Sequence, residues 1–123
     1  MDPKNLSYTK QHEWVSLADG TAKIGLTDYA QNAMGDIVYI GFPDIGDALT
    51  LGDSCCDIES VKAVSHIYAP VDGEISAINE ALEDEPDLIN KDPYNAWIIE
   101  ASSITETADL MNHDQYEDYL KTV

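Results

Sequence analysis

The chain has 123 residues, of which 24 are acidic and 6 are basic, so its formal net charge is −18 at pH 7. This charge excludes nucleic acid and anionic membrane surfaces as partners, because both are bound chiefly by Lys and Arg, and it favours partners with positively charged surfaces. The length predicts a single domain spanning residues 1–123, with its acidic side chains interleaved among apolar ones rather than gathered in disordered blocks.

The first elements expected along the chain are a β-hairpin and a short helix. Residues 12–17 and 21–26 are typical of two strands joined at Asp19-Gly20, a dipeptide that tolerates the positive φ of a tight turn. Thr27 is a suitable cap for a helix near 28–34, and Gly35 is a suitable stop for it.

From residue 37 to residue 100 the sequence is typical of short strands separated by turns. Turn signals recur as FPDIGD, LGD, APVDG, DEP and KDPYN. This spacing favours a β sandwich or barrel over a sheet of alternating strands and helices. The tail differs, because apolar residues at near-helical spacing predict C-terminal helices near 105–121 that cover the β core.

No segment of the sequence reads as a targeting signal or a membrane span. The first 14 residues have neither an apolar signal core nor an Arg-rich transit pattern. No apolar run reaches the roughly 20 residues that a membrane span requires. Cys55 and Cys56 are adjacent, so strand geometry would point them apart, and we expect no structural disulfide. These features favour a bacterial cytoplasmic location over the mitochondrial matrix.

No local motif indicates an enzyme or a metal site. No serine or cysteine lies in a recognisable nucleophile motif. The three histidines, His12, His66 and His113, lack metal-ligand spacing. We therefore expect neither a catalytic residue nor a bound metal.

The run ESVKAVS, residues 59–65, places one of the six lysines within a β-leaning segment. Strand alternation would give Lys62 the same inward face as Ile58 and Val64. A buried unpaired ammonium is costly, so either the chain turns near Lys62, or the lysine reaches outward or lies on a sheet edge. Between Ser60 and Ala69 no Gly, Pro or Asn marks a turn. The residues alone thus leave two hypotheses, a functional lysine or an edge lysine that opposes aggregation.

Longer stretches of the chain resemble the glycine cleavage system H protein family of lipoyl carriers. The resemblance implies a mainly β fold, a lipoyl/biotinyl-type flattened β-barrel sandwich of two antiparallel sheets. It also implies that the ε-amine of Lys62 is joined to lipoic acid in an amide, so that the cofactor does the carrying. The matching stretches follow the family's order along nearly the whole chain: HEWV (12–15), IGLTDYAQ (24–31), GDIVYIGFPDIGD (35–47), ESVKAVS (59–65), YAPVDGEISAINEAL (68–82), LIN (88–90) and PYNAW (93–97).

By the same resemblance the protein is a carrier and not an enzyme. A pyridoxal-phosphate glycine decarboxylase (P protein) would load an aminomethyl group onto the oxidised lipoyl group. A folate-dependent aminomethyltransferase (T protein) would release ammonia and pass the one-carbon unit to tetrahydrofolate. A flavin dihydrolipoamide dehydrogenase (L protein) would reoxidise the dithiol. A lipoate ligase or a lipoyl/octanoyl transferase would attach the cofactor, and the carrier is expected to be a monomer.

The resemblance assigns further roles around the modified lysine. Glu13 matches a glutamate in the cavity that shelters the loaded arm, although an acid beside a strand Trp also fits a solvent-facing position. Glu59 matches an acid that the lipoylating enzyme recognises, although it also fits a plain outward acid. His66 departs from the acid common at its position in the family, which alters the arm-docking cavity. The Pro93–Trp97 loop is one residue shorter than is typical, with Ala96 in place of Gly.

Three other functions remain open at this point. A biotin carrier shares the fold and the tip lysine, but biotin acceptors resemble MKM, and Val61-Lys62-Ala63 has no flanking methionine. An H-like paralogue would keep Lys62 while relaying lipoyl groups to other complexes or serving in an oxidative-stress response. An interaction module would leave the lysine unmodified, and an intact-mass measurement would distinguish it.

Overall fold

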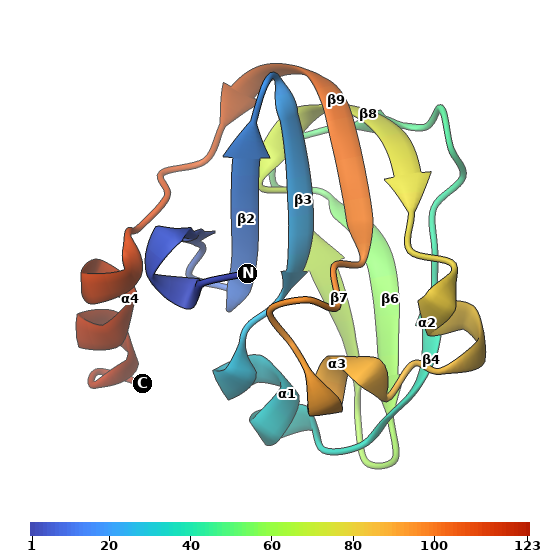
Figure 1. Ribbon diagram of the computed structural model, residues 1–123, viewed down its shortest axis with the longest axis vertical. Coiled ribbons are helices and arrows are strands. Elements are labelled where there is room, and N and C mark those ends of the chain that lie inside the picture. Colours follow the sequence, from blue (N-terminus) through green and yellow to red (C-terminus); the bar gives the residue numbers. More distant parts are fainter.

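The computed structural model describes all 123 residues as two antiparallel sheets with short helices around them (Figure 1). The larger sheet has the order β1-β2-β3-β9-β8-β5 and the smaller one the order β4-β6-β7, so the sheets form a sandwich rather than a closed barrel. The mainly β, two-sheet prediction is confirmed. The strands are β1 (Ser7–Tyr8), β2 (Glu13–Ala18), β3 (Thr21–Leu26), β4 (Ile37–Gly41), β5 (Ala48–Leu49), β6 (Ser54–Ser60), β7 (Val64–Tyr68), β8 (Val71–Ile78) and β9 (Ile99–Thr107).

The predicted hairpin and first helix are both confirmed. Strands β2 and β3 are joined by a two-residue turn in which Asp19 and Gly20 have φ values of 53° and 77°. Helix α1 (Asp28–Met34) begins after Thr27, whose hydroxyl accepts a hydrogen bond from the amide of Ala30 at 3.2 Å. It ends at Gly35, which has a φ of 79°. Local turn and cap chemistry therefore determines this part of the chain.

The tail is only partly helical. Strand β9 continues to Thr107, which pairs with Val71 of β8, so the prediction of helices near 105–121 was wrong for its first part. Helix α4 (His113–Leu120) begins after Asn112, which forms a capping box with Gln115. The pairing with β8 is a long-range interaction that overrides the local spacing of apolar residues.

Three short helical segments were missed by the sequence analysis. They are the 3-10 helix η1 (Pro3–Asn5), α2 (Ala81–Asp84) and α3 (Leu88–Lys91). Leu82 of α2 and Ile89 of α3 are buried in the main core. One turn of helix is too short to establish a helical period, so its sequence cannot be told from a loop. No helix has the length and apolar character needed to span a bilayer.

Two hydrophobic clusters hold the molecule together. The main cluster contains 19 buried residues drawn from both sheets and from α2 and α3. A smaller cluster of Leu6, Tyr8, Trp14 and Tyr116 fixes α4 against the N-terminal segment. The hairpin of β6 and β7 ends in a loop at the foot of the molecule in Figure 1. The scaffold thus presents that loop from a packed base.

Candidate functional site

Lys62 lies in the turn between β6 and β7, at the foot of the sandwich in Figure 1. Glu59 pairs with Val64 across the hairpin, so residues 60–63 form the connection. Lys62 is exposed, and Val61 and Val64 are 67% and 64% exposed. Of the alternatives left open for Lys62, the one in which the chain turns is confirmed. Because the turn resets the alternation of faces that began in β6, Val64 faces outward and not inward. The lysine amine is therefore accessible to other proteins.

Ser60 supplies the turn chemistry that the sequence analysis missed. Its hydroxyl accepts hydrogen bonds from the amides of Lys62 at 3.3 Å and Ala63 at 3.0 Å, and its own amide donates to the carbonyl of Ala63 at 2.8 Å. The amide of Val61 donates to the carbonyl of Asp36 at 3.0 Å, which ties the turn to the strand beside it. A serine hydroxyl can close a turn in place of Gly, Pro or Asn, and this was the available signal.

The stem of the lysine lies along Gly35. A Cβ atom at Gly35 would lie 3.3 Å from Cε of Lys62, so the absence of a side chain there gives the stem room. Asn90 of α3 supports this base, since its amide group donates to the carbonyl of Gly35 at 2.9 Å and its side-chain oxygen accepts from the amide of Ile37 at 2.9 Å. The base beneath the lysine turn is thus built from the end of α1, the start of β4 and helix α3.

Glu59 lies at the end of β6, three residues before Lys62, and is half-buried. It faces Tyr39 of β4 on one side and Val64 of β7 on the other. Its carboxylate is paired with no lysine or histidine. A protein that approaches Lys62 along this face would contact Glu59 between the side chains of Tyr39 and Val64.

Glu13 is buried at the start of β2 and lines a pocket of about 410 Å³. It is only 1% exposed, so the solvent-facing position considered for it was wrong. Its carboxylate accepts hydrogen bonds from the hydroxyl of Thr9 at 3.0 Å and from the amide of Tyr68 at 2.8 Å. Burial raises the pKa of Glu13 to about 7, against the opposing effect of these hydrogen bonds. The pocket therefore contains a carboxyl group that changes charge near neutral pH.

His66 lies on β7 between the lysine tip and this pocket. Val64, His66 and Tyr68 share the outward face of the strand, and Tyr68 also lines the Glu13 pocket. The Nδ1 atom of His66 lies 2.7 Å from Oδ1 of Asp57 on β6. The five residues of β7 span about 16 Å at about 3.3 Å each, so this face forms a path of roughly that length from the lysine turn to the pocket.

The Pro93–Trp97 loop is fixed to the hairpin of β2 and β3. The carbonyl of Pro93 accepts a hydrogen bond from Nε1 of Trp14 at 3.0 Å, and the ammonium of Lys23 lies 5.1 Å from the centre of the Trp97 ring. Ala96 is buried in the main core at 5% exposure, and its φ is not positive. The loop therefore accommodates Ala96 without backbone strain.

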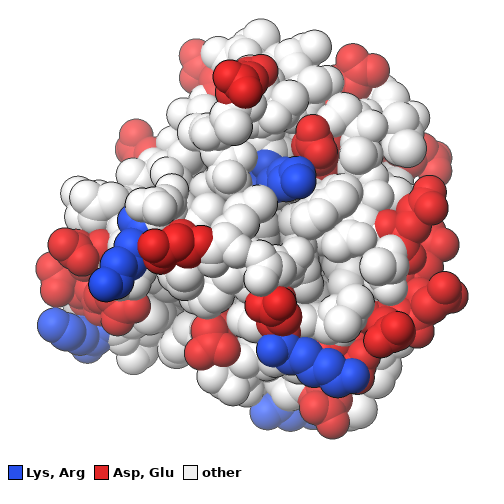
Figure 2. Space-filling model, viewed as in Figure 1, with Lys and Arg blue, Asp and Glu red and all other residues white.

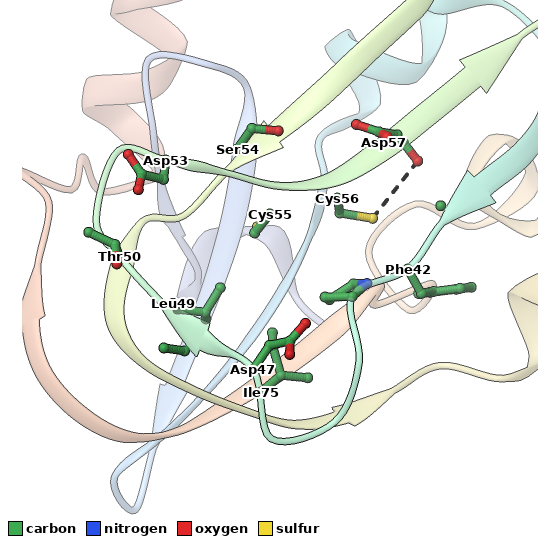
Figure 3. Close-up of a pocket in the computed structure, with 13 residues that line it drawn as sticks. Phe42, Asp47, Leu49, Thr50, Asp53, Ser54, Cys55, Cys56, Asp57 and Ile75 are labelled. Atoms are coloured by element: carbon green, nitrogen blue, oxygen red, sulfur yellow. Dashed lines mark hydrogen bonds between the residues drawn. The ribbon is translucent and has the colours of Figure 1, made fainter.

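A larger pocket of about 570 Å³ lies elsewhere, between β5, β6 and the segment after β4 (Figure 3). Cys55 and Cys56 line it as free thiols, together with Asp47, Asp53 and Asp57. Burial raises the pKa of Cys55 to about 12 and raises the pKa of Cys56 as well, so neither is a reactive thiolate at neutral pH. No group of three or more His, Cys, Asp or Glu side chains is arranged to hold a metal ion.

Known proteins are similar to this chain in sequence and in fold. The sequence model described as "Glycine cleavage H-protein" matches residues 6–123. A glycine cleavage system H protein from Listeria innocua is 51% identical over 118 residues, which is 94% of each chain. The chain belongs to the glycine cleavage H-protein family. It is therefore a non-catalytic carrier component of a glycine cleavage system.

Two further comparisons extend this family assignment. A probable glycine cleavage system H protein from Pyrococcus horikoshii is 48% identical over 124 residues, covering 98% of this chain and 92% of its own. The crystal structure of a glycine cleavage system H protein from Mycobacterium marinum matches with a TM-score of 0.91 at 34% identity, over 98% of this chain and 99% of that chain. The two-sheet architecture is thus that of a solved H protein.

Proposed function

We propose that this protein carries lipoic acid as an amide on Lys62 and shuttles an aminomethyl group between the enzymes of glycine cleavage. The observation that supports this most strongly is the exposed position of Lys62 at a hydrogen-bonded turn of a two-sheet scaffold. A carrier needs an acylable amine that enzymes can reach, on a support that holds its base still. The lipoyl group would supply a dithiolane whose S–S bond is reduced as it accepts the aminomethyl group. Release of that group would leave a dithiol, which gives up two electrons when it is reoxidised.

The residues around Lys62 fit such an attachment. Gly35 leaves room along the lysine stem, and the amine has no carboxylate partner. Val64 and Tyr68 on the outward face of β7 offer apolar surface to a hydrocarbon arm, from the tip to the Glu13 pocket. We propose that the loaded arm docks along this path.

Glu13 and His66 have separate parts in this docking. The carboxylate of Glu13, which is only 1% exposed, would pair with the ammonium of the aminomethyl group. His66 would contribute from the rim, where its contact with Asp57 sets its position. Glu59, between Tyr39 and Val64, would be the acid that the lipoylating enzyme recognises.

The partners in this proposal are a glycine decarboxylase, an aminomethyltransferase and a dihydrolipoamide dehydrogenase. A lipoate ligase or a lipoyl/octanoyl transferase would attach the cofactor. Similar chains occur in Listeria species, which supports a bacterial cytoplasmic location. We also propose that residues 1–123 act as one carrier domain, because a single main core joins both sheets.

Intact mass before and after lipoylation, followed by glycine–bicarbonate exchange with glycine decarboxylase, tests the proposal. We expect the mass to increase by one lipoyl or octanoyl group, located on Lys62 by peptide mapping. Lys62→Ala and the cation-retaining control Lys62→Arg should remain folded, gain no mass and support no exchange. A biotin mass, a modified residue other than Lys62, or unfolding of both variants would contradict the proposal.

One observation favours a second candidate, a lipoyl relay or stress-linked lipoyl protein outside glycine catabolism. His66 stands where the family commonly carries an acid, and it is paired with Asp57. Such a protein would gain the lipoyl mass on Lys62 but would not support glycine–bicarbonate exchange. The exchange assay therefore separates the two functions.

A further inference from the structure

Strand β4 exposes two neighbouring apolar side chains close to the lysine tip. The pairing of β4 with β6 shifts register between Ile37 and Tyr39. Val38 and Tyr39 are consecutive, yet they are 53% and 56% exposed. In a regular strand one of the two would face the core, so the irregularity turns an apolar side chain outward.

A groove of about 350 Å³ runs beside these residues, between β4 and α2. Val38, Phe42 and Ile78 are among its apolar lining residues, and Asp44 and Glu83 are its acidic ones. Strand β4 is an edge of the smaller sheet and pairs only with β6. Acidic side chains border the molecule along the side of β4 and α2 in Figure 2. The groove is thus apolar inside and negative at its border.

The groove is tied to the lysine turn through the backbone. The carbonyl of Asp36, the residue before β4, accepts the hydrogen bond from the amide of Val61 at 3.0 Å. Lys62 is the next residue in the turn. A protein whose active site receives the lysine arm would therefore lie next to the outer side of β4.

We infer that this groove binds a basic surface segment of a glycine cleavage enzyme, which places an apolar side chain against Val38 and Phe42. The inference rests on the proposed function of Lys62. Charge identifies the occupant, because the groove has carboxylates and no lysine in its lining, and the whole chain carries −18. A second copy of this chain would bring like charges together, whereas Lys or Arg would complement Asp44 and Glu83.

The test measures the affinity of the lipoylated carrier for each of the three purified enzymes by titration calorimetry. Two variants probe the groove, Val38→Ser for its apolar wall and Glu83→Lys for its charge. Two matched controls carry the same changes elsewhere, Leu17→Ser on β2, which is 48% exposed, and Glu106→Lys at the exposed end of β9. Intact mass of every protein confirms lipoylation, so a failure of the proposed function is read separately from a failure of the groove.

For at least one enzyme we expect Glu83→Lys to weaken binding about 5- to 10-fold at low salt, and Val38→Ser about 3- to 10-fold. The controls should stay within about twofold, and the effect of Glu83→Lys should vanish near ~0.5 M salt while that of Val38→Ser persists. Unchanged affinity of both groove variants for all three enzymes would overturn the inference. Equal losses of affinity in the two control variants would also overturn it. So would a dimer of this protein that forms in the parent and is abolished by Val38→Ser.

Discussion

The carboxyl group of Glu13 is subject to two opposing effects. Burial raises its pKa from 4.5 to about 7, and the hydrogen bonds from Tyr68 and Thr9 lower it by less. Between these two values the folded protein binds more protons than the unfolded chain. The contribution of Glu13 to stability is therefore fully present below pH 4.5 and is lost as pH rises to about 7.

Glu13→Gln is expected to remove this pH dependence. Relative to the variant, the parent protein should lose on the order of 3 kcal/mol of unfolding free energy across this window. Urea unfolding at several pH values between about 4 and 8 measures the difference, because the offset between the proteins must then change with pH. A constant offset would show that Glu13 ionises in the folded state as it does in the unfolded chain.

The same carboxyl group should control how long the loaded arm survives. We expect Glu13→Gln to shorten the lifetime of the aminomethyl-loaded carrier several-fold, because the amide cannot neutralise the ammonium. His66→Ala should change that lifetime as well, through the rim of the pocket. Neither change should slow lipoylation. A mass-spectrometric time course gives both quantities, and lifetimes equal to that of the parent would remove both residues from the docking path.

Ser60 is expected to position Lys62 for the lipoylating enzyme. Ser60→Ala removes the hydroxyl that accepts from the amides of Lys62 and Ala63, and a displaced amine should slow lipoylation by about 10-fold. Ser60→Thr retains the hydroxyl and should retain the rate. Ser65→Ala, at another exposed serine of the same hairpin, is the matched control. Equal rates for the Ala and Thr variants would refute this role.

At the scale of elements, the predictions succeeded where neighbouring residues determine the conformation. Asp19-Gly20 and the Thr27–Gly35 segment contain their own turn and cap residues, so the hairpin and α1 were predictable. Strand β9 beyond residue 105 and the two one-turn helices depend on contacts with distant segments. Their sequences do not contain that information.

The candidate site divides in the same way. Lys62 stood out by composition, but its roles and those of Glu13, Glu59 and His66 came from the family resemblance. The burial of Glu13 requires the amide of Tyr68, which lies 55 residues further along the chain. The turn at Lys62 requires Asp36 as well as Ser60. Periodicity alone could not have predicted either contact, because both join segments from different parts of the fold.

Helix α4 offers a test at the same scale, because its start depends on one side chain. Asn112 accepts from the amide of Gln115 at 2.9 Å, and Tyr116 stacks on Tyr8 with ring centres 4.6 Å apart. Asn112→Ala should lower the unfolding free energy by about 1 kcal/mol, whereas Asn112→Asp keeps a capping oxygen and should lose much less. Urea unfolding measures both. Equal losses would show that stacking alone holds the helix.

The charge of the whole molecule is mostly uncompensated. The chain has 24 acidic residues, yet only Lys91 and Lys121 form ion pairs with carboxylates among its lysines. Acidic side chains are spread over the face shown in Figure 2 rather than confined to one patch. At low ionic strength their mutual repulsion favours the expanded unfolded chain, in which the charges lie further apart.

Added salt should therefore stabilise this protein. Between about 10 mM and 0.5 M KCl the unfolding free energy should rise by on the order of 1–2 kcal/mol, because the Debye length falls from about 30 Å to under 10 Å. Urea is the suitable denaturant because it is uncharged. The double variant Glu106→Lys/Asp109→Lys changes two exposed acids to lysine, which takes the net charge from −18 to −14, and its salt dependence should be shallower. Two outcomes would contradict this prediction: a stability that falls with salt, or a variant with the same salt dependence as the parent. Either would mean that specific ion pairs, rather than net repulsion, determine how stability depends on salt. The few ion pairs present give no reason to expect such a result.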